Sequence, residues 1–546
     1  MKSILKKCER MGLGKTISVN SIYFFFVIII FLISFSAPKA QSYSQSGGNV
    51  TKTNQAYTAS STDESGVKVT NSGVLTLSNS SVTTSGNSSS LDNSSFQGLN
   101  AGILATSGST INLSDCTVNT TGTGANGVFS YGSGTTVNMT RLTIKCTAQG
   151  GHAIMATGGG IMTATDVDMT TAGANSGAIA TDRGGGTITV TGGKVIASGQ
   201  DSPGIYSTGN ITVTGADISA TGAEAAVIEG ANSITLNKTS LTSSKANKWG
   251  VMIYQSMSGD AEGARGIFTT TGGTLSNTAT TGPLFYITNT TAIITLNNTN
   301  VSAASGMLLK AAAGNWGTTG KNGGYANLTA NKQKLSGDIT VDALSTFTGE
   351  LKDSSSLTGA INNSNTASSV SLTLDATSKW ILTANSNLSI LSDGSGIAGS
   401  SVTNITGNGF NVYYDASLAA NSALGGKTYS LVNGGSLMPK GTSAVDESSS
   451  SLPANWSLEQ NYPNPFNPST TISFSMPEPG LAMLKIYDIT GKEVAILVND
   501  ELAAGNHSYS WNSGSLASGI YIYRISVLSG DKKRVFSQSR KLVLAK

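Results

Sequence analysis

The sequence predicts an all-β protein in which a right-handed parallel β-helix, or solenoid, is followed by a small β-sandwich. The first observation is an eight-residue pattern that recurs along much of the chain, with apolar residues at its first, third and eighth positions. The second is that apolar and polar residues alternate over short segments, which Gly, Asn and Ser interrupt. Such alternation is typical of strands that bury one face. The third is a change of composition near residue 440, after which longer alternating segments begin.

The composition excludes several classes of protein. Charged residues make up 12% of the chain, while 38% of the residues are apolar and 65 are glycine. A disordered linker could be as poor in charge, but it has no reason to place its apolar residues at fixed spacing. The net charge of +3 is too small to indicate a nucleic-acid partner. We therefore expect a folded chain with no nucleic-acid partner and no cofactor.

Residues 1–40 are predicted to be a secretory signal peptide. Five Lys and Arg residues precede an apolar run over residues 22–35, and small residues follow it around Ala40. The run is shorter than the roughly 18 apolar residues that a membrane-spanning helix needs. We expect cleavage near Gln41 and no stable membrane span.

Residues 41–439 are predicted to form the solenoid. The first positions of the eight-residue pattern are Leu75, Ile111, Val137, Met162, Ile188, Ile211, Ile234, Phe268 and Ile294. A second apolar cluster precedes the pattern in nearly every coil, as in Ile103-Leu104 and Val128-Phe129. A repeat of this length must stack on its neighbours to bury its apolar face. No segment keeps a helical period, so no helix is expected. After Gly306 the pattern loosens, and we expect less regular coils as far as Pro439. In its architecture this region resembles the pectin-lyase-like superfamily and autotransporter passengers.

Charged residues recur at two positions of the pattern. The fifth position holds Asp115, Arg141 and Asp166, and the seventh holds Asp168, Lys194 and Asp217. Both columns alternate in sign, as solvated side chains on adjacent strands do when like charges are kept apart. The alternative is a carboxylate patch at Asp166 and Asp168, which would make the protein a polysaccharide lyase or hydrolase. His152 is interpreted as a turn residue, and we expect no enzymatic activity.

Threonine fills the second and fourth positions of many coils. Examples are Thr163 and Thr165, Thr189 and Thr191, and Thr212 and Thr214. Threonine is a good strand residue on a wet face, which is one explanation. Regular arrays of this kind also resemble those of some ice-binding proteins, so ice binding is a further alternative.

The two cysteines of the solenoid are predicted to stay unpaired. Cys116 and Cys146 lie four residues apart along neighbouring strands, about 13 Å at roughly 3.3 Å per residue. A disulfide needs Cα atoms within about 7 Å.

The C-terminal part begins with a Ser-rich linker at residues 440–455, followed by a predicted β-sandwich at residues 456–546. Its strands are expected near residues 472–474, 482–487, 493–497, 507–511, 520–527 and 535–544. Four motifs occur in order: Asn-Tyr-Pro-Asn-Pro-Phe-Asn-Pro at 461–468, Ile-Tyr-Asp-Ile-Thr-Gly-Lys-Glu-Val at 486–494, Leu-Ala-Ser-Gly-Ile-Tyr at 516–521, and the terminal Arg-Lys-Leu-Val-Leu-Ala-Lys at 540–546.

Together these motifs resemble the type A C-terminal sorting domain of type IX secretion. The residues assigned to the sorting signal are Asn461, Tyr462, Pro463, Asn464, Pro465, Phe466, Asn467, Pro468, Asp488, Gly491, Gly519, Tyr521, Lys541 and Lys546. The resemblance implies export through the periplasm, recognition by the type IX machinery, and then surface attachment or release. The expected function is that of a secreted or cell-surface passenger, either structural or adhesive, whose partner is an extracellular glycan or another surface ligand.

Overall fold

The computed structural model describes residues 41–257, 263, 265–441, 455–514, 516–528 and 534–545. The predicted signal peptide, most of the predicted linker and Lys546 lie outside these residues. The chain divides into two compact units, residues 1–441 and 442–546. Among the described residues, no helix is long and apolar enough to cross a membrane.

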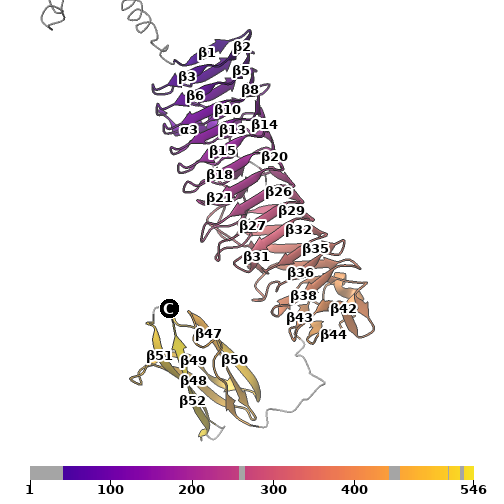
Figure 1. The fold of residues 1–546 in the computed structure, drawn as a ribbon. Coiled ribbons are helices and arrows are strands. Elements are labelled where there is room, and N and C mark those ends of the chain that lie inside the picture. Colours follow the sequence, from indigo (N-terminus) through magenta and orange to yellow (C-terminus); the bar gives the residue numbers. More distant parts are fainter. Residues whose placement is uncertain are drawn as a thin grey trace, which may run out of the picture. The chain divides into compact units, whose positions relative to one another are not determined.

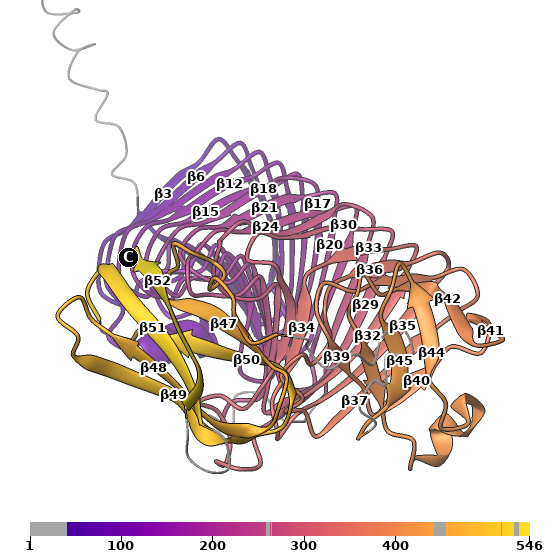
Figure 2. The same cartoon turned by 90° about the horizontal axis from the view of Figure 1, so that it is seen from below.

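The first unit is a parallel β-solenoid, which confirms the predicted fold (Figure 1). In the regular region, each coil adds one short strand to each of three sheets. One coil consists of β10 (Val128–Tyr131) in sheet A, β11 (Thr136–Thr140) in sheet B and β12 (Thr143–Cys146) in sheet C. Figure 2 shows the coils stacked along the axis of the solenoid.

The other strands of sheet A are β1 (Tyr43–Ser46), β4 (Val67–Thr70), β7 (Ile103–Thr106), β13 (Ile154–Thr157), β16 (Ile179–Thr181), β19 (Ile205–Ser207), β22 (Ala226–Glu229), β25 (Val251–Tyr254), β28 (Phe285–Thr288), β31 (Met307–Ala311) and β34 (Asp338–Val341). Those of sheet B are β2 (Asn49–Thr53), β5 (Val74–Ser78), β8 (Thr110–Ser114), β14 (Gly160–Thr165), β17 (Gly186–Thr191), β20 (Asn210–Thr214), β23 (Ser233–Asn237), β26 (Arg265–Thr271), β29 (Thr290–Asn297), β32 (Gly324–Asn331), β35 (Thr346–Lys352), β37 (Ser369–Leu374) and β40 (Ile390–Ser392). Those of sheet C are β3 (Ala56–Ala59), β6 (Ser81–Thr84), β9 (Thr117–Thr120), β15 (Asp168–Thr171), β18 (Lys194–Ala197), β21 (Asp217–Ala220), β24 (Ser240–Ser243), β27 (Thr274–Asn277) and β30 (Asn300–Ala303).

The eight-residue pattern runs from a strand of sheet B through a corner into a strand of sheet C. Its first positions stack in register, as Ile188 on Ile211 and Ile211 on Ile234 show. Ile211 and Ile218, the first and eighth positions of one coil, are both fully buried. The predicted inward positions are therefore correct.

A left-handed residue turns the chain at the corner between sheets B and C. The φ angle at the fifth position is 53° for Asp115, 56° for Arg141 and 52° for Asp166. This region favours Asn, Asp and Gly, and other coils place Asn79, Gly192, Gly215, Asn298 and Asp353 there. The backbone conformation thus explains why this column consists mostly of Asp, Asn and Gly.

The expectation that the solenoid contains no helix is wrong. Helix α3 (Leu91–Gln97) lies in the connection between the second and third coils, from β6 to β7. Ser90 caps its first turn by accepting a hydrogen bond from the backbone N of Asn93, and Gly98 ends it with a φ of 74°. A helix of seven residues is too short to show a helical period in the sequence. A 3₁₀ helix, η2 (Ala419–Leu424), also lies near the C-terminal end of the solenoid.

The last coils are less regular, as predicted after Gly306. Besides the strands that continue sheets A and B, these coils contain a fourth sheet, sheet D, made of β33 (Lys334–Ser336), β36 (Ser356–Thr358), β38 (Lys379–Ile381), β39 (Ser386–Asn387), β41 (Ile397–Ala398), β42 (Ser401–Thr406), β43 (Val412–Tyr414), β44 (Tyr429–Val432) and β45 (Ser436–Pro439). Here β41 pairs with β42, and β44 with β45, in antiparallel fashion. One apolar core nevertheless continues from Tyr57 to Leu437.

The second unit consists of two antiparallel sheets that share one apolar core, which confirms the predicted sandwich. One sheet contains β46 (Ser457–Leu458), β47 (Ser469–Met476) and β50 (Gly505–Asn512). The other contains β48 (Gly480–Tyr487), β49 (Glu493–Leu502), β51 (Gly519–Leu528) and β52 (Arg534–Leu544).

Both cysteines of the solenoid are buried and unpaired, as expected. Cys146 lies opposite Thr120, which is four residues beyond Cys116. Burial raises the pKa of the Cys146 thiol to about 12.

Candidate functional sites

In the second unit, the Pro-rich segment (residues 460–468) lies against the terminal strand β52. The backbone N of Phe466 donates to the carbonyl of Val543 at 3.0 Å, and the backbone N of Ala545 donates to the carbonyl of Phe466 at the same distance. The Asn464 side chain accepts from the backbone N of Val543 at 2.8 Å. Gln460 donates to the carbonyl of Lys541 at 2.8 Å. Two of the four predicted sorting motifs thus form one structural element.

Within the Pro-rich segment, Asn461 is buried and Tyr462 is exposed. The Asn461 side chain donates to Thr470 Oγ1 at 2.9 Å, and its backbone N donates to the phenol oxygen of Tyr523 at 2.9 Å. Tyr523 in turn donates to the carbonyl of Glu459 at 2.6 Å. The Tyr462 side chain is 81% exposed. Buried hydrogen bonds therefore fix the backbone of this segment, while one aromatic side chain faces solvent.

The other two motifs form a turn and a strand start. Asp488 Oδ1 accepts from the Thr490 hydroxyl at 2.6 Å and from the backbone N of Lys492 at 3.0 Å. The hydrogen bond from Thr490 lowers the pKa of Asp488, and Gly491 takes a φ of 87° in the same turn. Tyr521 donates to the carbonyl of Ala517 at 2.8 Å. Gly519 begins β51 and pairs with Leu544 of the terminal strand.

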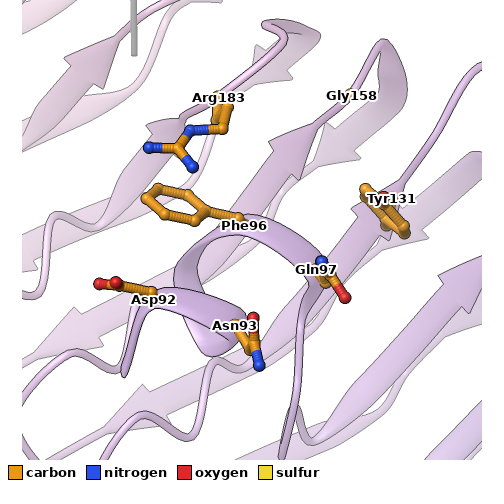
Figure 3. Close-up of a pocket in the computed structure, with 7 residues that line it drawn as sticks. All are labelled: Asp92, Asn93, Phe96, Gln97, Tyr131, Gly158 and Arg183. Atoms are coloured by element: carbon orange, nitrogen blue, oxygen red, sulfur yellow. The ribbon is translucent and has the colours of Figure 1, made fainter. Parts of the chain in front are cut away.

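In the solenoid, helix α3 forms a pocket of about 350 Å³ with the outer face of sheet A. Its lining is Asp92, Asn93, Phe96, Gln97, Tyr131, Gly158 and Arg183 (Figure 3). The Arg183 guanidinium lies over the Phe96 ring, with 4.0 Å between its Cζ atom and the ring centroid, a cation–π contact. Tyr131, Gly158 and Arg183 come from three successive coils, so the pocket exists only because the coils stack in register.

The outer face of sheet A is apolar around this pocket. One outward column contains Leu104, Phe129, Met155, Ala180, Tyr206, Val227, Met252 and Tyr286, which pair in register from coil to coil. Phe129 and Met155 are fully buried although they point away from the solenoid core. The sequence carried a signal for this, because Ile103-Leu104 and Val128-Phe129 are adjacent apolar pairs, as in strands that are covered on both faces.

Further along sheet A, aromatic residues surround a buried carboxylate. Glu229 is 2% exposed and accepts hydrogen bonds from the phenol groups of Tyr206 and Tyr254, the latter at 2.7 Å. Burial is the main cause that raises the pKa of both tyrosines. Trp249 stacks on Tyr286 with 4.3 Å between the ring centroids. The ring centroids of Trp316 and Tyr254 are 5.1 Å apart, and Trp316 is 40% exposed. The aromatic surface thus continues from the α3 pocket toward the C-terminal coils.

The predicted carboxylate patch lies at a different place. Asp166 is the left-handed corner residue between β14 and β15, and Asp168 begins β15 in sheet C. Asp168 Oδ1 accepts from the backbone N of Lys194 at 2.9 Å. In the same corner column, Arg141 and Asp115 form an ion pair at 2.7 Å. Among the described residues, no cluster of three or more His, Cys, Asp or Glu side chains could hold a metal ion.

His152 is more deeply placed than its interpretation as a turn residue implies. It is 9% exposed, and its Nδ1 donates to the carbonyl of Gly177 at 2.9 Å. Its backbone N donates to Asn126 Oδ1 at 2.9 Å. The side chain therefore links successive coils within the solenoid wall.

The comparisons with known proteins concern the second unit. Residues 460–538 match the family described as the secretion system C-terminal sorting domain. A search of curated proteins gave no match for the chain. Fold and match together define an exported protein with a β-solenoid passenger. Its C-terminal unit is a type IX secretion sorting domain, so the protein is secreted or reaches the outer-membrane surface.

Proposed function

We propose that the solenoid is an adhesive passenger that binds an extracellular glycan on the outer face of sheet A. The observation that supports this most is the α3 pocket, because it combines two aromatic rings with amide, carboxylate and guanidinium groups. A sugar ring presents C–H groups on its faces and hydroxyl groups on its rim. The rings of Phe96 and Tyr131 can pack against the C–H faces. The side chains of Asn93, Gln97 and Asp92 can form hydrogen bonds with the hydroxyl groups. The pocket volume also falls in the range of small-molecule sites.

The aromatic surface beyond the pocket supports a chain-like ligand. Tyr206, Trp249 and Trp316 extend the site over several coils. A polymer lying along the solenoid would contact residues at successive coil spacings, which a single sugar cannot do. The solenoid resembles the pectin-lyase-like superfamily in its architecture, and its membership of that superfamily remains a prediction.

Glycan-array binding by the exported full-length protein tests this proposal. We expect Phe96→Ala and Tyr131→Ala to abolish binding, while Tyr325→Ala, which removes an aromatic ring that is 39% exposed on β32 of sheet B, leaves binding unchanged. Product assays on any glycan that binds test the alternative of a polysaccharide lyase or hydrolase. Binding that survives both pocket substitutions would contradict the proposed site.

For the sorting domain, we propose that the fourteen residues assigned from the sequence form the recognised signal. Deleting residues 458–546 should leave the passenger in the periplasm, because the solenoid has its own core. Fusing that segment to an unrelated exported domain should direct the fusion outside. Fractionation of a host with type IX machinery into periplasm, surface and medium measures both. Surface delivery of the truncated protein would refute the assignment.

A further inference from the structure

The outer face of sheet B carries two columns of small hydroxyl and amide side chains. From β14 to β29, one column reads Thr163, Thr189, Thr212, Thr235, Thr269 and Thr295, and the other reads Thr165, Thr191, Thr214, Asn237, Thr271 and Asn297. All five strand pairs keep their register without a bulge, and the labelled strands β14, β20, β26 and β29 follow one another in this order along the solenoid in Figure 1. The groups therefore repeat at the strand spacing of about 4.8 Å and, along each strand, at about 6.6 Å.

The hydroxyl groups in the middle of this block are available to an outside partner. Amide side chains at and beyond the edges of the block are paired: Asn138 donates to Asn112 at 2.9 Å, Asn331 to Asn297 at 2.8 Å, and Asn297 to Thr271 Oγ1 at 3.3 Å. Within the described chain, the hydroxyls of Thr163, Thr189 and Thr212 have no such partner. A threonine hydroxyl can both donate and accept a hydrogen bond.

The face is uncharged along both columns. The charged residues of these coils lie outside the two columns: Asp166 is at the corner, Lys194 and Asp217 are in sheet C, and Glu229 is in sheet A. Arg265 stands at the start of β26, to one side of the columns. The face is thus a rigid, uncharged and periodic array of groups that donate and accept hydrogen bonds. Its partner should be a solid surface that is also uncharged and presents hydrogen-bonding groups at regular spacing.

We infer that this threonine face, defined by the two columns between β14 and β29, binds the surface of ice. Ice presents water molecules in a fixed lattice, each of which donates and accepts hydrogen bonds. A crystalline polysaccharide would instead expose C–H faces that favour aromatic rings, and the two columns contain none. The threonine face lies on a different sheet from the α3 pocket, so this inference does not depend on the proposed glycan site.

Thermal hysteresis and inhibition of ice recrystallisation, measured on the exported full-length protein, test the inference. Thr189→Lys combined with Thr212→Lys places two long charged side chains in the centre of the face and should abolish both effects. The matched control is Ser219→Lys combined with Thr242→Lys, which places the same charges on neighbouring outward positions of sheet C. We expect the control to keep the activity, and thermal unfolding shows that both variants are folded.

Three results would overturn the inference: an inactive unmodified protein, equal loss in both double variants, or full activity of Thr189→Lys with Thr212→Lys. Pull-down with insoluble cellulose and chitin adds a further arm. Binding to these solids that disappears in Thr189→Lys with Thr212→Lys would identify a crystalline glycan as the partner and exclude ice. None of these outcomes bears on the proposal that the α3 pocket binds a glycan.

Discussion

The Asn464 side chain accepts a hydrogen bond from the backbone N of Val543 at 2.8 Å, although 79 positions separate the two residues. This bond joins the Pro-rich segment to the last strand of the sorting domain. Phe466, beside it, is 2% exposed and exchanges backbone hydrogen bonds with the same strand. The first and last motifs of the domain are therefore held together by hydrogen bonds between its two ends.

Replacing Asn464 by Ala should lower the stability of the second unit by about 1 kcal/mol, because one hydrogen bond is lost and a backbone N–H loses its partner. Delivery to the surface should fall with it, since the terminal strand is held less firmly. Chemical denaturation and fractionation measure the two effects. Asn499→Ala, at an exposed position of β49, is the control and should change neither. Equal effects of the two substitutions would contradict the role given to Asn464.

Ile211→Asp should be severely destabilising, and Thr212→Asp should be tolerated. Ile211 is fully buried in the solenoid core, where an unpaired carboxylate costs several kcal/mol, at least about 3. Thr212 is the next residue on β20 and points outward, so its substitution should change stability by no more than about 0.5 kcal/mol. The midpoint of thermal unfolding measures both. Similar midpoints for the two variants would show that the inward and outward positions are misassigned.

Substitutions of Lys238 test whether the corner between sheets B and C requires a left-handed backbone conformation. Its φ is 49°, in the same column where Gly215 and Gly272 have φ values of 68° and 63°. Lys238→Val should lose about 1–2 kcal/mol, because a β-branched side chain is strained in this region. Lys238→Gly should be close to neutral. Denaturation midpoints compare the two, and a well-tolerated valine would show that the corner does not require a left-handed residue.

The inward residues of the solenoid could be predicted from the sequence because each coil repeats the same alternation. Ile188, Ile211 and Ile234 each mark one strand, and their common spacing fixes the register. Six of the sandwich strands can be predicted for the same reason, although β49 extends to Leu502, further than the apolar residues indicate, and the two-residue strand β46 is not predicted. Local periodicity therefore carries most of the fold.

The α3 pocket could not be predicted in this way. Its residues come from one short helix and three coils, and the only local signals of the helix are its caps at Ser90 and Gly98. The contact between Asn464 and Val543 could not be predicted either, because it joins two segments that are far apart in the sequence and are each predicted to be extended. Alternation within a strand says which way a side chain points, but not what an inserted loop will cover.

His152 should remain neutral down to unusually low pH. Burial lowers its pKa from 6.5 to about 4, and its Nδ1 donates to the carbonyl of Gly177. Between pH 6.5 and 4 the unfolded chain binds a proton that the folded chain does not, so stability falls as the pH is lowered through this window. The contribution that is present above pH 6.5 and lost by pH 4 amounts to about 3 kcal/mol.

An NMR titration of the imidazole C–H signals checks this directly. The sequence contains two histidines, so the variant His507→Asn leaves His152 as the only one. We expect its resonance to titrate with a midpoint near pH 4, in keeping with the lowered pKa. In the same background, His152→Gln keeps a donor for the Gly177 carbonyl but cannot take up a proton, so its stability should depend less on pH between 4 and 6.5. A His152 midpoint near 6.5, or the same pH dependence in both proteins, would mean that this side chain reaches solvent in the folded solenoid.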